Sequence, residues 1–355
     1  MNTLKASLLG LLLALATTAH AQFQFSENNG TLTVTGYSGP DTVITIPSTN
    51  TAGELVTSIG ASAFQGSSLA SVTIPDSITN IGTGAFLMCG SLTNITIIGH
   101  GLVSINLGAF IYCTALATIT LPDSVTALGD SVFLNSGLTT ITLPGNLTTT
   151  GNSTLSGCTN LARAIIAPGI INCGGGCFKD CIALTNVSIP EGVTNLGGSA
   201  FINCISLTNL TLPASVTNIG TSAFSGCTNL AGLYFKGDAP TAPASAFGSG
   251  SNTLSAVCYY LPNTTGWAST LGGLPTRLWD PQMQTQYGVF GMHTNEFGFN
   301  ITASTNLTVV VQACTDLLNG NWRPVQTVTL TNAAAYFSDP QWTNYPGRFY
   351  RISSP

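Results

Sequence analysis

The most constraining feature of this sequence is a repeat of about 23 residues that runs through its middle. Each copy contains an apolar anchor, and the fullest copies read Ile-Gly-x-x-Ala-Phe around it. Successive anchors are 22, 24, 23, 22, 23, 23, 23 and 23 residues apart. The anchors are Phe64, Phe86, Phe110, Phe133, Leu155, Phe178, Phe201, Phe224 and Phe247. A short, constant period indicates stacked units, each burying against its neighbours an apolar face that it cannot bury alone.

Each period contains one segment with the pattern of a half-buried strand. In residues 207–213 apolar and polar side chains alternate, and Pro213 then ends the strand because it has no N–H to donate. Ile219 and the Ala223-Phe224 pair are expected to point inward from the rest of the coil. Strands repeated in this way, about 4.8 Å apart, predict a mainly β solenoid with one continuous parallel sheet over nine coils.

The repeat closely resembles a known family. Residues 68–89, SLASVTIPDSITNIGTGAFLMC, are similar to the BspA-like subfamily of bacterial leucine-rich repeats, and residues 32–47 resemble its first strand pair. The resemblance covers roughly residues 30–280. It implies a secreted or surface protein that binds other macromolecules and can act as an adhesin, with no shared catalytic residues. The fifth coil departs from the pattern at Leu155 and at residues 163–168, so we expect an irregular sheet there.

The N-terminus has the pattern of a secretory signal peptide. Lys5 precedes an apolar run over residues 6–16, and Ala19 and Ala21 are small residues at the positions that a signal peptidase reads. The run is too short to span a membrane, which takes about 20 residues, and no later segment is long and apolar enough. These features predict export of the mature chain, to the medium or the cell surface.

Past the repeats, the chain changes character. After Pro281 the period is lost, and short alternating runs separated by turn residues predict a small β-sandwich-like domain. It resembles C-terminal modules that are appended to secreted bacterial proteins. The predicted organisation is a signal peptide (1–21), N-terminal capping strands (22–58), leucine-rich repeats (59–250), a C-terminal cap and linker (251–281) and the small β-domain (282–355).

Charge and reactive residues favour binding over catalysis. Only 6% of residues are charged and the net charge is -5, with no basic cluster for a phosphate backbone, so nucleic acid is not an expected partner. His100 and His293 have no partnered nucleophile or carboxylate at a recognisable spacing. We therefore expect no enzyme activity, no cofactor and no catalytic residues.

Cysteines recur three residues after the anchor and should form an inward column. They are Cys89, Cys113, Cys158, Cys181, Cys204 and Cys227. Two interpretations remain open: free buried thiols that act as small apolar side chains, or disulfides between adjacent coils of an exported protein. Cys173, Cys177 and Cys181 have a spacing that fits no common zinc motif, and we predict no metal site.

The outward strand face is the one surface with the pattern of a site. The candidate ligand-binding residues are Thr73, Asn94, Thr96, Thr118, Thr120, Thr140, Thr142, Asn186, Ser188, Asn209, Thr211 and Tyr234. Alternation also places Ala164 and Ile166 outward in the fifth coil, where they interrupt the polar columns. The result is a flat, uncharged face rich in hydroxyls and amides, which is either a solvated β-surface or a recognition surface for a protein or glycan. An ice-binding plane is disfavoured by the interruption at Ala164 and Ile166.

Aromatic residues near the C-terminus are a second candidate. Trp322, Tyr336, Trp342, Tyr345, Phe349 and Tyr350 are expected mostly in the sandwich core, with one or two exposed rings available to stack on sugars. The function that the sequence favours is extracellular binding or adhesion to a protein or glycan. The alternative is a structural or matrix component in which the strand face self-associates.

Overall fold

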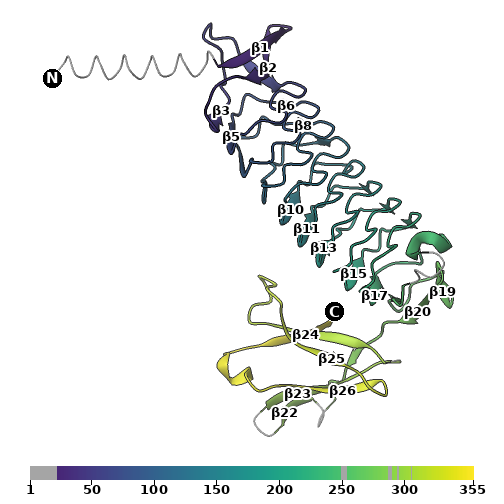
Figure 1. Ribbon diagram of the computed structural model, residues 1–355. Helices are drawn as coiled ribbons and strands as arrows, with labels where there is room; N and C mark the ends of the chain where they lie inside the picture. Colours follow the sequence, from purple (N-terminus) through teal and green to yellow (C-terminus); the bar gives the residue numbers. More distant parts are fainter. Residues whose placement is uncertain (1–21, 249–253, 287–289, 294–295, 305) are drawn as a thin grey trace. The chain divides into compact units, whose positions relative to one another are not determined.

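The chain forms two compact units. The computed structural model describes residues 22–248, 254–286, 290–293, 296–304 and 306–355, so the predicted signal peptide lies outside the described residues. The first unit extends to Thr208 and adds Ser215–Leu230 and Pro240–Ser255, and the second comprises Asn209–Ala214, Ala231–Ala239 and Ala256–Pro355. The first unit is a stack of coils and carries most of the repeats (Figure 1).

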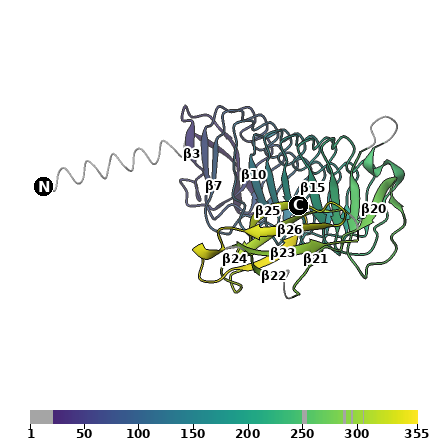
Figure 2. The same cartoon turned by 90° about the horizontal axis from the view of Figure 1, so that it is seen from below.

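Two rows of short strands follow the coils of the first unit (Figures 1 and 2). The first row holds the predicted strands, namely β3 (Val43–Thr45), β5 (Ser71–Ile74), β7 (Asn94–Ile97), β10 (Thr140–Leu143), β11 (Arg163–Ile166) and β13 (Asn186–Ser188). The second row starts with the antiparallel hairpin β1 (Phe23–Asn28) and β2 (Thr31–Tyr37) and continues with β4 (Val56–Ile59), β6 (Asn80–Ile81), β8 (Ser104–Ile105), β9 (Ala127–Leu128), β12 (Asn172–Cys173), β14 (Asn195–Leu196) and β16 (Asn218–Ile219). All other pairs within these rows are parallel, which confirms the predicted parallel solenoid.

The anchors form a ladder of stacked rings through the core of the first unit. Phe64, Phe86, Phe110 and Phe133 have ring centroids 5.0, 5.2 and 5.5 Å apart in succession. Phe178, Phe201, Phe224 and Phe247 repeat the arrangement at 5.2, 5.3 and 5.8 Å. Leu155 occupies the anchor position between the two stacks and has no ring to continue them. The expectation that the anchors fill the core is confirmed, because each is at most 3% exposed.

The glycine of the repeat pattern follows from the same close stacking. A Cβ on Gly82 would lie 2.6 Å from the carbonyl carbon of Gly60, and one on Gly220 would lie 2.5 Å from the nitrogen of Gly198. Such distances are far inside van der Waals contact, so a side chain here would force adjacent coils apart. Glycine is therefore required where the backbone turns of successive coils touch.

The prediction of one continuous sheet is wrong. The first row consists of the separate sheets β3-β5-β7 and β10-β11-β13, because residues 117–121 form no strand between β7 and β10. The second row is likewise divided between β9 and β12. The irregularity thus begins in the coil of Phe110, two coils before that of Leu155 and residues 163–168, where the sequence pattern placed it.

A one-residue deletion lies next to this break. Most coils place two residues between the anchor-plus-three position and the next inward leucine, as in Cys113 to Leu116, whereas Ser136 to Leu138 and Ser67 to Leu69 have one. The coils still touch at the anchor turn, where the Phe110 amide donates to the Val132 carbonyl at 2.8 Å. β5 follows an equally short link and pairs on both sides, so link length alone does not account for the unpaired segment.

The second unit contains three sheets. β15 (Asn209–Leu212), β17 (Gly232–Phe235), β18 (Val257–Tyr260) and β20 (Leu274–Leu278) pair in parallel, and β19 (Thr270–Leu271) closes the edge antiparallel to β20. The two other sheets are antiparallel: β21 (Gln282–Met283), β22 (Phe290–His293), β23 (Glu296–Thr302) and β26 (Ala334–Asp339) form one, and β24 (Thr308–Cys314), β25 (Arg323–Thr329) and β27 (Phe349–Ser353) form the other. Two short 3-10 helices complete the described elements, η1 (Ala244–Phe247) in the first unit and η2 (Trp342–Asn344) in the second.

The two antiparallel sheets enclose a common apolar core, as expected for a small sandwich-like module. Phe299 and Phe337 of one sheet and Val309 and Val311 of the other are fully buried in it. The six C-terminal aromatic residues were predicted to lie mostly in this core, and that prediction is wrong. Each of Trp322, Tyr336, Trp342, Tyr345, Phe349 and Tyr350 is partly or fully exposed, because the inward positions are filled by β-branched residues, leucine and phenylalanine.

Candidate functional site

The strand register fixes which side chains share the outward face of the first row. Thr73 of β5 lies beside Thr96 of β7, and Thr140 of β10 lies beside Arg163 of β11. Arg163 is in turn the neighbour of Asn186 in β13. The columns run as predicted except in the fifth coil.

In that coil the predicted orientation is wrong by one residue. Ala164 and Ile166 are 1% and 2% exposed and point inward, whereas Arg163 and Ile165 take the outward positions. The signal that locates the register is Leu161, because inward leucines throughout the array precede the first inward strand residue by three positions. A one-residue slip exchanges the two faces of a strand completely. The polar face is therefore not uncharged, since it carries the exposed cation Arg163.

The predicted site residues differ in how their polar groups are used. The Asn94 amide donates to Ser71 Oγ at 3.1 Å and to Thr96 Oγ1 at 3.2 Å, and Thr73 is half-buried. Thr118, Thr120, Thr140, Thr142, Asn186 and Ser188 are all exposed, and their side chains make no hydrogen bond within the described part of the chain. The second group therefore has free hydrogen-bonding capacity.

A depression lies where the strand pairing is interrupted. Thr118 and Thr120 of the unpaired segment and Thr140 and Thr142 of β10 line it, together with Asp123, and its volume is about 400 Å³. Arg163 stands beside it as the strand neighbour of Thr140. The interruption thus brings four predicted site residues together around a hollow, although Thr118 and Thr120 do not lie in the strand that was predicted for them.

Three of the predicted residues belong to the second unit. Asn209 and Thr211 of β15 are partly exposed. Tyr234 of β17 is only 8% exposed because its ring stacks on Tyr259 at 4.9 Å and meets the edge of Trp279 at 6.2 Å. Burial raises the pKa of the Tyr234 hydroxyl. Tyr234 is therefore a packing residue rather than an open contact position, which corrects its placement among the exposed candidates.

Outward polar residues of the second row pair with one another instead. The Asn195 amide donates to Asn172 Oδ1 at 2.8 Å, the Asn218 amide donates to Asn195 Oδ1, and the Thr241 hydroxyl donates to Asn218 Oδ1 at 3.0 Å. The side-chain amide oxygens in this ladder already accept hydrogen bonds, so they are less available to a ligand. Polar groups open to a ligand are therefore concentrated on the first row, around the interruption.

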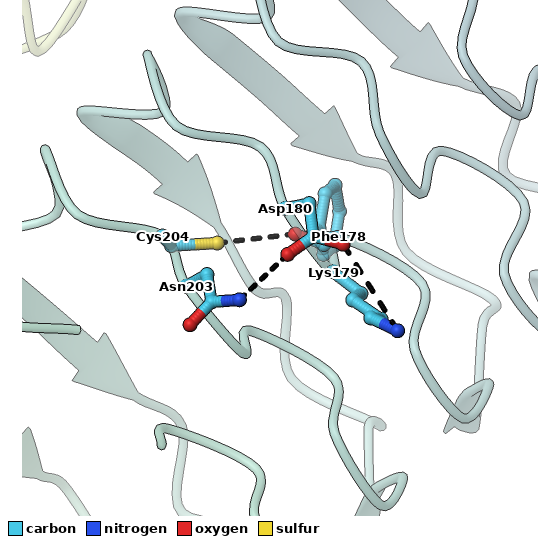
Figure 3. Close-up of polar contacts among 5 residues, drawn as sticks. All are labelled: Phe178, Lys179, Asp180, Asn203 and Cys204. Carbon is cyan, nitrogen blue, oxygen red and sulfur yellow. Dashed lines mark hydrogen bonds and ion pairs between the residues drawn. The ribbon is translucent and has the colours of Figure 1, made fainter. Parts of the chain in front are cut away.

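The cysteine column consists of buried free thiols, not disulfides. Each thiol donates to the carbonyl of the anchor one coil earlier, as Cys204 does to Phe178 at 3.1 Å (Figure 3). Figure 3 also shows the neighbouring surface, where the Asn203 amide donates to Asp180 Oδ1 at 2.7 Å and Lys179 lies 4.0 Å from Asp180. Burial raises the pKa of Cys113 and Cys227 to about 12, so these thiols remain neutral at physiological pH.

The candidate metal and acid–base residues lie apart in the chain, at positions of different kinds. Cys173 and Cys177 are fully buried in core positions, and no group of three potential metal ligands occurs among the described residues. His100 is exposed in the turn of the longest coil, where its backbone N–H donates to Asp76 Oδ1 at 2.7 Å. His293 ends β22. In the described ranges we find no helix of the length and apolarity needed to cross a membrane.

Solved leucine-rich repeat proteins are among those similar to this chain. A solved leucine-rich repeat protein from T. pallidum is 27% identical over 59% of this chain and 88% of its own, with a TM-score of 0.45. One from Bacteroides ovatus is 25% identical over 72% and 74%, with a TM-score of 0.48. A leucine-rich cell surface protein from Faecalibacterium prausnitzii is 24% identical over 69% and 88%, with a TM-score of 0.42.

The family itself is shown by a match to its sequence model. None of the curated proteins is significantly similar to this chain. The model of the BspA type leucine-rich repeat region matches six copies, over residues 42–162 and 159–258, which together exceed half of the chain. This chain therefore belongs to the BspA-type leucine-rich repeat family.

Proposed function

We propose that the chain is an extracellular binding or adhesion protein, exported by the signal peptide at residues 1–21, with the outward face of the first strand row as its contact surface. The partner is an extracellular protein or glycan. The observation that carries the proposal is the contrast between the two rows. Outward side chains around the interruption have free hydrogen-bonding groups, whereas those of the second row bond to each other.

Rigidity and charge support the same surface. Thr140 and Thr142 stand on β10, whose inner face is buried, so a ligand that contacts them restricts little additional backbone motion. Each hydroxyl contributes a weak contact, and affinity accumulates over several coils. Arg163 adds a cation beside the depression, which favours partners that present acceptor or acidic groups there.

The decisive experiment fills the depression. We expect Thr120→Arg with Thr142→Arg to abolish attachment of the purified protein to the extracellular surface that the parent binds, because two long side chains occupy the hollow. The matched control is Thr159→Arg with Thr228→Arg, two exposed positions in equivalent anchor turns. Attachment is measured by surface binding of labelled protein, and folding by circular dichroism.

Two results would contradict the proposal. A folded Thr120/Thr142 variant that attaches like the parent would show that the strand face is only a solvated surface. Concentration-dependent assembly in light scattering, lost in the same variant, would assign the face to self-association in a matrix. A protein that stays monomeric at high concentration and still attaches supports binding to a different partner.

A further inference from the structure

The C-terminal β-module contains two contiguous clefts that the strand-face proposal does not use. The first, of about 410 Å³, is lined by polar residues that include Asn319, Asn321 and Arg323. The second, of about 240 Å³, is lined mainly by aromatic rings, including Trp342. Both are bordered by Tyr345 and Arg348, so they form one composite site with a polar end and an aromatic end.

Residues at the boundary between the clefts are held rigidly. Arg348 Nη1 lies 2.8 Å from Asp339 Oδ2, and the two side chains are only 13% and 2% exposed. The Tyr350 hydroxyl donates to the same carboxylate oxygen at 2.8 Å. The Arg348 guanidinium lies 4.3 Å from the centre of the Tyr345 ring and fixes that ring in place. The charge of Arg348 is thus neutralised by Asp339, and its role is to position Tyr345.

One unpaired cation remains at the polar end. Asp316 Oδ1 accepts from the Leu318 amide at 2.8 Å, so this carboxylate is committed to its own loop, and that hydrogen bond lowers its pKa. Arg323, the first residue of β25, is exposed and has no ion-pair or side-chain hydrogen-bond partner in the part of the chain that the structure describes. An anionic group that entered the polar cleft would meet Arg323 with no carboxylate already bound to it.

We propose that this composite site binds an acidic saccharide of the uronic acid class. A sugar ring presents an apolar C–H face and a rim of hydroxyls, which match the ring of Tyr345 and the amide of Asn321, whereas the Asn319 amide already donates to Asp316. The carboxylate of the uronic acid pairs with Arg323, whose planar guanidinium suits two parallel hydrogen bonds. The polar cleft falls within the range of roughly 300–1,000 Å³ that is usual for small-ligand sites.

Calorimetric titration of the full mature chain tests the proposal with trigalacturonate as the probe. The neutral galactose trisaccharide and inorganic phosphate are the reference ligands. We expect trigalacturonate to bind at least about tenfold more tightly than either, because only it offers both a ring face and a carboxylate. Arg323→Gln should remove that preference, and Tyr345→Ala should weaken the binding of both saccharides. Arg277→Gln, which removes an exposed arginine outside both clefts, should bind like the parent.

Defined outcomes would overturn the proposal. Equal binding of the neutral and acidic trisaccharides refutes the acidic class, and phosphate binding as tightly as trigalacturonate reduces the site to an anion site. Unchanged binding by Arg323→Gln refutes the location. Should Tyr345→Ala fail to fold, Asn321→Asp tests the same site without loss of packing, because its added carboxylate repels the ligand and competes for Arg323.

Discussion

At the scale of single residues, the array depends on what occupies the anchor position. Phe178 is fully buried and its ring stacks on Phe201 at 5.2 Å, so it packs against coils on both sides. Leu155 fills the same position one coil earlier, where Thr150 and Thr154 are also fully buried. The fifth coil is therefore a less apolar layer between two phenylalanine stacks.

Truncating an anchor should be costly for this reason. We expect Phe178→Ala to lower the free energy of unfolding by about 3–5 kcal/mol, because the surrounding coils cannot collapse into the cavity. The measurement is urea denaturation followed by circular dichroism. Ile182→Ala, at an apolar residue of the same coil that is 41% exposed, is the matched control and should cost less than about 1 kcal/mol. A loss of less than about 1 kcal/mol in Phe178→Ala would show that the anchor side chains do not contribute substantially to the stability of the core.

At the scale of elements, periodicity predicted the coils but not their second strands or their break. The second strand of most coils has only two residues, as in Asn80–Ile81, which is too short for an alternating pattern to be visible. Local polarity predicts the wrong face at Arg163 because residues 163–166 do not alternate between polar and apolar side chains, whereas the distance from Leu161 fixes the register. The depression was not predictable from residue types, since residues 117–121 have the same alternating pattern as the paired strands but form no strand.

Lengthening the link at Ser136–Leu138 tests whether coil length contributes to the interruption of the sheet. We expect replacement of Ser136-Gly137 by Cys-Thr-Asn, the residues that precede Leu161, to bring residues 117–121 into register between β7 and β10. Hydrogen exchange at the amides of 118–121 should then slow, because they gain backbone partners. The melting temperature should rise, and attachment through the depression should be lost.

A control separates insertion from the added thiol. Ser136→Cys alone keeps the short link, so it should leave both the fast exchange and the attachment unchanged. Fast exchange at 118–121 in the insertion variant would mean that coil length does not cause the interruption.

At the scale of the whole molecule, the buried thiols link stability to alkaline pH. Burial raises the pKa of Cys158 to about 11 and of Cys113 and Cys227 to about 12, against about 8.5 for an exposed thiol. The folded state therefore holds these protons more tightly than the unfolded state does. Below about pH 8 the thiols are protonated in both states and their contribution to stability is fully present. As the pH rises from about 9 towards 12, only the unfolded state ionises, and that contribution is progressively lost.

The expected result is a steep fall in the free energy of unfolding between pH 9 and pH 10.5, of up to about 1.4 kcal/mol per pH unit for each thiol. Urea denaturation at pH 7.5, 9 and 10.5, with a reductant present throughout, measures it. Cys113→Ala with Cys227→Ala removes two of these thiols. The free energy of unfolding of this variant is lower at pH 7.5, but it should fall less steeply as the pH rises. If the free energy of unfolding fell equally with pH in parent and variant, these thiols would ionise as easily in the folded array as in the unfolded chain. The raised pKa values of the cysteine column would then be wrong.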